Sequence, residues 1–337
     1  MRICVIGAGA IGGLLGAKLV RAGNHVTLID QGAHLAAIKR NGLKLIWEDG
    51  DEYVARPALA TDDLSAAGPQ DIIVLALKAH YLEQIAPDID GLLGPDTMIV
   101  TVQNGIPWWY FHRIGGPLDG TRLETVDPGG VLEKNIDSGR IIGCVVYPAA
   151  SIPEPGIIQH VEGDRLPVGE LDGQLTPRVQ RLHDTLVEAG FRSRILDDIR
   201  SEIWLKAWGN LSFNPISALT HATLAEICQA PETRHLAAEM MREAQEIGEK
   251  LGATFRHTIE KRIAGAEGVG AHKTSMLQDV EFGRSLEIEA LIGSVLELGR
   301  LTGTPAPSIA AVYACTKLLN RSILKRRAGV TFQSAAQ

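Results

Sequence analysis

Three polar side chains recur every four residues in an apolar helical segment: Lys206, Asn210 and Asn214. Each is offset by only about 40° from the last on an α-helix, so the three share one face. Their neighbours are Trp204, Leu205, Trp208, Leu211 and Phe213. Because a lysine on a buried helix loses hydration, this pattern predicts a general acid, Lys206, with a pKa tuned by burial and an asparagine to orient it. The alternative is a salt-bridged lysine with two bridging asparagines. Pro215 is predicted to end or kink the helix.

Two further polar residues follow predicted buried strands. Lys78 comes after the apolar run 71–77, and Asn104 comes after the run 97–102. A strand-end lysine can pair with the phosphates or ribose of a dinucleotide, or can simply be solvated. Asn104 precedes a glycine and is a turn signal by itself. At the carboxyl end of a parallel strand, its side chain would also point toward the nicotinamide end of a bound cofactor.

The C-terminal third contains another set of polar candidates. Ser275 stands before an apolar helical run and can serve as an N-cap or as a ligand donor. Glu287 and Glu289 are two residues apart and cannot share a helix face. We therefore expect one of the two carboxylates to point inward.

The N-terminus carries a phosphate-binding pattern. An apolar strand at 2–6 runs into a glycine turn and then into apolar residues at helical spacing. Gly7 allows the tight turn, Gly9 lets the backbone approach a pyrophosphate, and Gly12 lets the helix pack on the strand. The predicted cradle consists of Gly7, Ala8, Gly9, Ala10, Ile11 and Gly12. The alternative interpretation of residues 7–12 is a glycine turn that serves packing alone.

A second predicted strand, 25–29, ends in Asp30. A carboxylate at this position can accept hydrogen bonds from the adenosine ribose hydroxyls. A glycine cradle between a strand and a helix, followed by this acid, predicts a dinucleotide site.

The elements that would hold these groups alternate between strands and helices in the first half. A helix at 32–41, strands at 43–47 and 53–55, the buried strands 71–77 and 97–102, and β segments at 141–147 and 156–161 are predicted. Alternating β and α units favour an α/β Rossmann domain with a doubly wound, mostly parallel sheet. Four consecutive aromatics, residues 108–111, open a Gly- and Pro-rich connection that extends to residue 140. We expect them to pack this loop onto the body, or else to line a pocket or subunit contact.

From about Asp198 the pattern becomes helical. Periodic segments are predicted at 202–213, 222–229, 233–251, 275–300 and 308–325. The predicted organisation is a Rossmann domain at 1–195, an all-α domain at 196–330 and a tail at 331–337.

Composition limits the classes of partner. The chain has 337 residues, 45% of them hydrophobic and 22% charged, and a net charge of −7. No basic excess exists to neutralise nucleic-acid phosphates, and we expect neither a membrane span nor a targeting segment. The four cysteines are scattered without a CxxC pair, which fits a reducing cytoplasm and predicts no metal cluster. Apolar helical surface favours a homodimer.

The motifs together resemble the ketopantoate reductase (2-dehydropantoate 2-reductase) family. They are GAGAIG, LKAH, QNG, the helical K-x3-N-x3-N-P, SMLQD and LEIE, which span nearly the whole chain. The resemblance implies a Rossmann domain followed by a helical domain, with substrate in the cleft between them. It also implies transfer of hydride from a reduced nicotinamide to the C2 carbonyl of a 2-oxo acid, which for this family is 2-dehydropantoate.

The resemblance also implies residue roles. Lys206 matches the proton donor to the keto oxygen, and Asn210 matches the residue that orients this lysine and contacts substrate. Glu287 is similar to the glutamate near the nicotinamide ribose and the lysine. The remaining matches are Asn214 and Ser275 for substrate, with Ser275 at the carboxylate, Asn104 for both cofactor and substrate, and Lys78 and Ala150 for cofactor.

Three departures from the family pattern bear on specificity. NADP(H) is the family default, and many members carry an arginine near the place of Asp30. A carboxylate there repels a 2′-phosphate and favours NAD(H). Leu224 stands where many members have a substrate-binding asparagine, and the 113–140 stretch is longer than in compact members. The leucine and the longer stretch leave a different 2-oxo acid as an alternative substrate.

Two other classes remain as alternatives. The 3-hydroxyacid and glycerol-3-phosphate dehydrogenases also use a helical lysine, but they lack the SMLQD segment. A non-catalytic dinucleotide sensor would bind cofactor without turnover, yet it has no need of a buried lysine aligned with two asparagines.

Overall fold

The computed structural model describes residues 1–331, and the predicted tail therefore lies outside the described residues from 332 onward. The chain divides into two compact units. The first unit consists of Met1–Gln103 and Trp108–Ile199, and the second unit consists of Asn104–Pro107 and the chain from Arg200 onward. The short segment Asn104–Pro107 thus belongs to the second unit, and the chain returns to the first unit at Trp108.

The first unit is built on a seven-stranded sheet. Its order is β11 (Val168–Glu170), β8 (Ile141–Cys144), β7 (Leu93–Thr101), β6 (Gln70–Leu75), β1 (Arg2–Ile6), β2 (His25–Ile29) and β5 (Leu59–Thr61). All neighbours pair in parallel except β11, which is antiparallel to β8. The parallel strands are continuous apolar runs because helices cover both faces. The predicted α/β class with a mostly parallel sheet is confirmed.

A second, four-stranded sheet belongs to the same unit, with the order β4 (Glu52–Ala55), β3 (Leu43–Ile46), β10 (Ile157–Glu162) and β9 (Ala149–Ser151). The two segments predicted near 43–55 form an antiparallel pair, and β3 also pairs in parallel with β10. Sequence analysis predicted strands in these segments but not this separate sheet.

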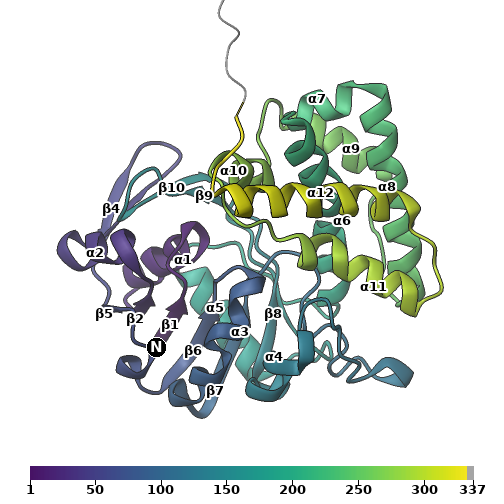
Figure 1. Cartoon of the computed structure of the whole chain (residues 1–337). Coiled ribbons are helices and arrows are strands. Elements are labelled where there is room, and N and C mark those ends of the chain that lie inside the picture. Colours follow the sequence, from purple (N-terminus) through teal and green to yellow (C-terminus); the bar gives the residue numbers. More distant parts are fainter. Residues whose placement is uncertain (332–337) are drawn as a thin grey trace, which may run out of the picture. The chain divides into compact units, whose positions relative to one another are not determined.

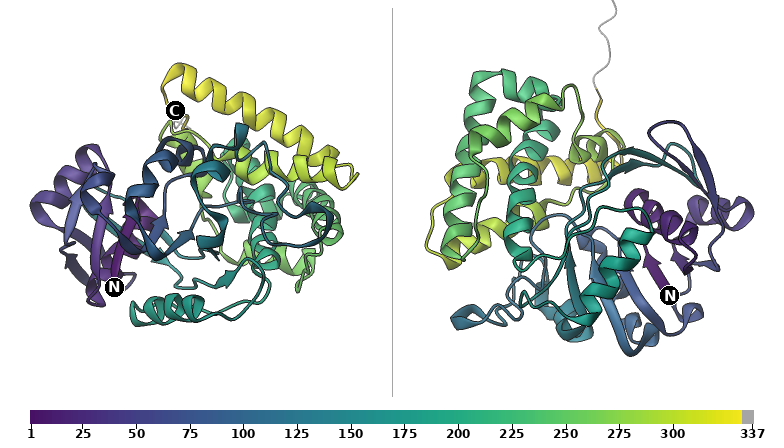
Figure 2. Two further views of the ribbon diagram at one scale, coloured as in Figure 1. Left: turned by 90° about the horizontal axis from the view of Figure 1, so that it is seen from below. Right: turned by 180° about the vertical axis from the view of Figure 1, so that it is seen from behind.

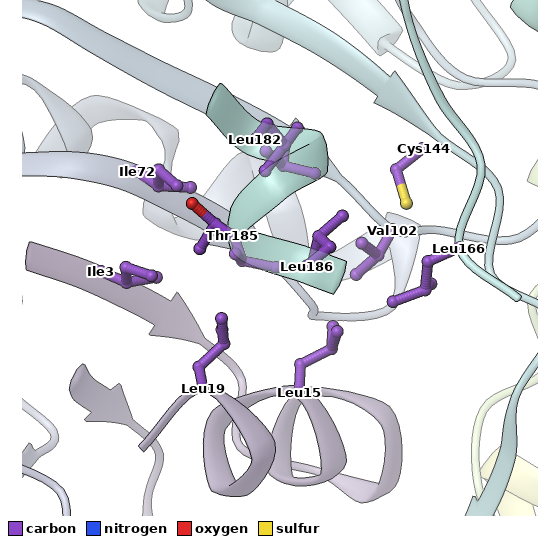
Figure 3. Close-up of a pocket in the computed structure, with 12 residues that line it drawn as sticks. Ile3, Leu15, Leu19, Ile72, Val102, Cys144, Leu166, Leu182, Thr185 and Leu186 are labelled. Carbon is purple, nitrogen blue, oxygen red and sulfur yellow. The ribbon is translucent and has the colours of Figure 1, made fainter. Parts of the chain in front are cut away.

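Helices cover the first unit's main sheet. They are α1 (Ala10–Arg21), α2 (Gly32–Asn41), α3 (Leu82–Ile85), α4 (Val131–Asn135) and α5 (Pro177–Glu188), with 3₁₀ turns η1 (Leu64–Ala67), η2 (Ala79–Tyr81), η3 (Ala86–Leu92), η4 (Gly116–Leu118), η5 (Pro128–Gly130) and η6 (Ser138–Arg140). In the view from behind, α5 (teal) lies across the sheet (Figure 2, right). Leucines of α1 and α5 meet over the strands around a small apolar cavity of about 20 Å³ (Figure 3).

The four aromatics after Pro107 are buried. Trp108 is 4% exposed, Trp109 is 1% exposed, and Tyr110 and Phe111 are fully buried. The indole N–H of Trp109 donates to the hydroxyl of Thr101 on β7 over 2.9 Å. The aromatics therefore pack the long connection onto the first unit, as the first of the two alternatives predicted.

The second unit is helical (Figure 1, green to yellow). It contains α6 (Ile199–Thr220), whose first residue belongs to the first unit, and α7 (Leu224–Gln229), α8 (Pro231–Lys250), α9 (Ile259–Gly268), α10 (Ser275–Glu281), the π-helical turn η7 (Glu289–Gly293), α11 (Ser294–Leu301) and α12 (Pro307–Arg326). Sequence analysis did not predict helix α9, although its buried residues Ile259, Ile263 and Ala266 recur at helical spacing. No helix within residues 1–331 is both long enough and apolar enough to span a membrane.

Two helix boundaries differ from the prediction. Helix α6 does not end at Pro215 but continues through it to Thr220, so the predicted helix end at this proline is wrong and the predicted kink stays a prediction. Burial of Phe213 and Ile216 on either side, each 2% exposed, favours the continuous helix over the lost backbone hydrogen bond.

The predicted single segment 275–300 is also wrong. It is interrupted after α10 by Gly283, which has a φ of +67°, and by the non-helical residues 284–287 before the π-helical turn.

Candidate active site

The amine of Lys206 and the side-chain amide of Asn104 form the central contact of the second unit. Lys206 Nζ donates to Asn104 Oδ1 over 2.6 Å, across 102 residues of sequence. Both side chains are described within the same unit, and Lys206 is half-buried in the middle of α6. The amide oxygen accepts an ammonium hydrogen and thereby orients the amine. An oriented, half-buried ammonium is suited to donate a proton.

A tight loop brings Asn104 to this position. Gly105 has a φ of +87°, and a Cβ built on it would lie 2.1 Å from the carbonyl oxygen of Ala290. The next residue, Ile106, donates its backbone N–H to the same carbonyl over 2.9 Å. Only glycine fits at this point, so the QNG sequence reflects a close backbone approach as well as a turn.

The two asparagines predicted to share the face of Lys206 lie one and two turns further along α6. Asn210 is half-buried and Asn214 is 7% exposed. At 5.4 Å per turn, the three polar groups form a row about 11 Å long.

Ser275 is not a helix cap. The N-cap of α10 is Thr274, whose hydroxyl accepts the N–H of Leu277 over 3.2 Å. Ser275 follows as the first helical residue and is exposed. The N-cap alternative for Ser275 is therefore wrong, because the neighbouring threonine already occupies that position.

Glu287 precedes the π-helical turn rather than lying on a helix. Its neighbours Leu286 and Ile288 are 3% and 2% exposed, whereas Glu287 is half-buried. Glu289 is also half-buried and accepts from Tyr313. The helix-face argument for these two glutamates is wrong, because the backbone between them is not a regular α-helix.

The glycine turn after β1 has a geometry that fits a dinucleotide. Gly7 has a φ of +96°, and a Cβ on Gly12 would lie 1.9 Å from the Gly7 carbonyl oxygen. The N–H groups of Gly7 and Ala8 donate to the Ile29 carbonyl at 2.9 and 3.2 Å, which ties the turn to β2. A Cβ on Gly9 would meet no atom within 4 Å, so this side of the turn is open. The first N–H groups of α1, at Ala10 and Ile11, have no carbonyl acceptor within their helix and can bind phosphate oxygens.

Asp30 follows β2 at the edge of this cradle. Its N–H donates to the Thr61 carbonyl over 3.1 Å, and its Oδ1 accepts the N–H of Gln31 over 2.6 Å. The half-buried carboxylate keeps a second oxygen that can accept from a ribose hydroxyl.

Sequence analysis missed His34, which lies in the first turn of α2. Its Nδ1 accepts the N–H of Gly156 over 3.0 Å. Its Nε2 therefore carries the proton and donates to the Ala8 carbonyl, also over 3.0 Å. His34 thus joins the glycine cradle to the turn before β10. No local pattern could reveal this contact, because 122 residues separate His34 from Gly156.

The two remaining cofactor candidates also lie in the first unit. Lys78 is half-buried directly before η2. Partial burial, with the charge of Lys78 as a second cause, lowers the pKa of His80 to about 4, so that imidazole is neutral at pH 7. Ala150 lies on β9 and pairs with His160 on β10. Within the described residues, no cluster of three or more His, Cys, Asp or Glu side chains could hold a metal ion.

Comparison with known proteins extends these observations to the whole chain. The family model described as Ketopantoate reductase PanE/ApbA matches residues 3–109, and its companion for the C-terminal part matches residues 198–320. A 2-dehydropantoate 2-reductase of Mesorhizobium japonicum is 54% identical over 320 residues, covering 95% of this chain and 98% of that protein.

Solved structures agree with this assignment. A putative ketopantoate reductase from Ralstonia solanacearum superposes with a TM-score of 0.90 at 39% identity, covering 95% of this chain and 98% of that one. A 2-dehydropantoate 2-reductase from Methylococcus capsulatus gives a TM-score of 0.80 at 26% identity, covering 96% and 98% of the two chains. The chain belongs to the ketopantoate reductase PanE/ApbA family.

Proposed function

We propose that this protein reduces 2-dehydropantoate to pantoate, a step of pantothenate biosynthesis, using a reduced nicotinamide dinucleotide. The observation that carries the proposal is the ammonium of Lys206 held 2.6 Å from the amide oxygen of Asn104 on a largely buried helix. The bound cofactor supplies a hydride to the C2 carbonyl carbon. The activity named for the 54% identical relative from Mesorhizobium japonicum supports the choice of substrate.

Lys206 supplies the proton. As the carbonyl carbon gains hydride, the C=O electron pair moves onto oxygen and takes a proton from Nζ, which gives the alcohol and a neutral amine. The amine then recovers its proton from water. Asn104 accepts one of the ammonium hydrogens and so orients the amine toward its role as donor, with Asn210 one turn away on the same helix.

The remaining polar groups would bind the substrate. Asn210 and Asn214 extend from Lys206 along α6, and we assign them to the polar groups of the substrate. Ser275 is exposed at the start of α10, and we assign it to the substrate carboxylate. Glu287 is assigned to the ribose next to the nicotinamide and to the orientation of Lys206.

The glycine turn, Lys78 and Ala150 would bind the dinucleotide. NADP(H) is the family default, yet Asp30 follows β2 at or next to the place where many members carry an arginine for the 2′-phosphate. Because like charges repel and a ribose hydroxyl can donate to a carboxylate, we propose that this protein prefers NADH to NADPH.

A second candidate is reduction of another 2-oxo acid by the same chemistry. Leu224, the first residue of α7, is half-buried and stands where many members have a substrate-binding asparagine. Its backbone N–H is already bonded to the His272 carbonyl over 3.0 Å. An apolar side chain there favours a substrate with an apolar group at that position.

We also propose a cytoplasmic homodimer. The four cysteines are free thiols, as a reducing compartment would maintain them. Large apolar side chains are exposed on the second unit, among them Leu318, which is 65% exposed, and Leu324, which is 49% exposed. Light scattering coupled to size exclusion tests the oligomeric state, and a monomer at micromolar concentration would contradict this proposal.

The decisive assay follows absorbance at 340 nm with a panel of 2-oxo acids and both cofactors. We expect 2-dehydropantoate to give the highest kcat/KM, with NADH preferred. A higher kcat/KM for a bulkier 2-oxo acid would favour the second candidate. Binding of cofactor, measured by nicotinamide fluorescence, without turnover of any 2-oxo acid would overturn both and favour a dinucleotide sensor.

A further inference from the structure

The last helix of the second unit carries a polar face that none of the proposed roles uses. Tyr313, Lys317 and Asn320 stand at i, i+4 and i+7 on α12. At 100° per residue, these positions fall within about 60° of one another. We refer to the three side chains as the α12 polar face.

All three contact the segment that contains Glu287. Asn320 Oδ1 accepts the backbone N–H of Leu286 over 3.1 Å. The Tyr313 hydroxyl donates to Glu289 Oε2 over 2.8 Å. The α12 polar face thus holds the chain on both sides of Glu287.

Lys317 completes this contact. Its Nζ donates to the Tyr313 hydroxyl over 2.7 Å and pairs with Glu289 Oε1 over 2.9 Å. Hydrogen bonds to Tyr313 and then to Glu289 raise the pKa of Lys317, so its ammonium stays charged. The side chains of Tyr313, Lys317 and Glu289 therefore form a closed network in which each bonds to the other two.

The segment held in this way has little regular structure of its own. Residues 284–287 are non-helical and follow Gly283, and the chain then enters the π-helical turn at Glu289. Single π turns are rare and frequently mark functional sites. The backbone of Glu287 is tied to the turn through its carbonyl, which accepts the N–H of Leu291 over 3.2 Å. Because residues 284–287 before it are non-helical, the position of this segment also depends on contacts with neighbouring elements.

The same turn also fixes the loop that contains Asn104. The Ala290 carbonyl accepts the N–H of Ile106 over 2.9 Å and the hydroxyl of Ser294 over 2.8 Å. Asn104, two residues before Ile106, is bonded to Lys206 Nζ. A continuous set of contacts therefore runs from α12 through the π turn to the proposed proton donor.

We propose that Tyr313, Lys317 and Asn320 are positioning residues for the reaction. They hold Glu287 through its neighbours Leu286 and Glu289, and they hold Asn104 and Lys206 through Ala290. We assign these three residues no contact with the reacting carbonyl of the substrate or with the amine of Lys206. This inference rests on the proposed function, because it takes Lys206 and Glu287 as members of the catalytic site.

The kinetic test uses Asn320→Leu, which removes the acceptor for Leu286, and Asn320→Asp, which keeps it. Lys317→Met is matched with Lys250→Met on α8, because Lys250 also pairs with a glutamate and is 44% exposed, against 38% for Lys317. We expect Asn320→Leu and Lys317→Met to lower kcat about tenfold or more, since small misplacements of reacting groups are costly.

The controls separate positioning from a general loss of structure. The Kd for cofactor should not change in any variant, Asn320→Asp should recover most of kcat, and Lys250→Met should behave as wild type. Wild-type kcat in both Asn320→Leu and Lys317→Met would overturn the inference.

Hydrogen–deuterium exchange on the same variants gives a readout that does not depend on turnover. We expect faster exchange in peptides covering residues 284–293 and 104–107, with unchanged exchange in α8. Unchanged exchange in both of those peptides would overturn the inference even if the wild-type protein reduces no 2-oxo acid. Inactivity of the wild type would overturn the proposed function alone.

Discussion

Gly105 approaches Ala290 so closely that a methyl group on its α-carbon would lie 2.1 Å from the Ala290 carbonyl oxygen. This contact sets the position of Asn104, and through it the position of the Lys206 amine. The site therefore depends on a backbone approach that only glycine permits.

The first prediction concerns this approach. Gly105→Ala must move the loop away from Ala290 and also adopt a φ of +87°, which L side chains rarely do. We expect kcat to fall about 100-fold or more, because the amide acceptor of Lys206 is displaced. Steady-state kinetics at saturating cofactor measure this. Gly252→Ala is the control, because Gly252 has a similar φ of +86° with no atom within 4 Å of an added Cβ. Equal kcat values for the two variants would contradict the prediction.

The second prediction concerns cofactor selectivity. Asp30→Arg replaces a carboxylate with a guanidinium that can pair with a 2′-phosphate. We expect the ratio of kcat/KM for NADPH to that for NADH to rise at least about tenfold, equivalent to about 1.4 kcal/mol. Asp62→Arg makes the same charge change at an exposed site, where the carboxylate is 70% exposed, and controls for net charge. An unchanged ratio in Asp30→Arg would show that this carboxylate does not face the ribose.

The third prediction concerns His34. His34→Leu removes both the donor to the Ala8 carbonyl and the acceptor for Gly156. We expect the cofactor Kd to rise about three- to tenfold, the effect of a lost hydrogen bond on the geometry of the cradle, with kcat at saturating cofactor unchanged. Fluorescence titration measures the Kd. His34→Gln offers donor and acceptor groups and should recover part of the affinity, whereas a wild-type Kd in His34→Leu would argue against this role.

The fourth prediction concerns the core beneath the cradle. Leu182 of α5 is 2% exposed and lines the apolar cavity that α1 and α5 share over the sheet. Leu182→Ala should lower the free energy of unfolding by about 2–5 kcal/mol, because the existing void grows. The exposed Leu175, 72% accessible, gives the control, and Leu175→Ala should change stability by no more than about 0.5 kcal/mol. Thermal and urea denaturation measure both, and equal stabilities would contradict the assigned packing.

The sequence predicted those parts of the fold that depend on local patterns. The glycine turn between an apolar strand and a helix, and the helix ending at Gly42, appear in the structure at or near the expected residues. These features depend on backbone conformation and on periodicity over a few residues, both of which can be inferred from sequence.

The parts that the sequence did not predict depend on contacts between distant residues. Pairing of β3 with β10, the bond from His34 to Gly156 and the approach of Ile106 to Ala290 each join segments more than 100 residues apart. The break after α10 also involves such a contact, because the N–H of Leu286 donates to the side chain of Asn320 on α12 instead of to a helical carbonyl. Hydrophobic periodicity continues across that break and therefore does not predict it.

The most direct test of the central claim compares Lys206→Ala with wild type in single-turnover reduction of 2-dehydropantoate, with cofactor binding measured on the same samples. Loss of the general acid should slow hydride transfer about 100- to 10,000-fold while the cofactor Kd stays unchanged. Lys250→Ala, which removes an ion-paired lysine on α8, should retain the wild-type rate. A Lys206→Ala variant that turns over at the wild-type rate would contradict the assignment of Lys206 as proton donor.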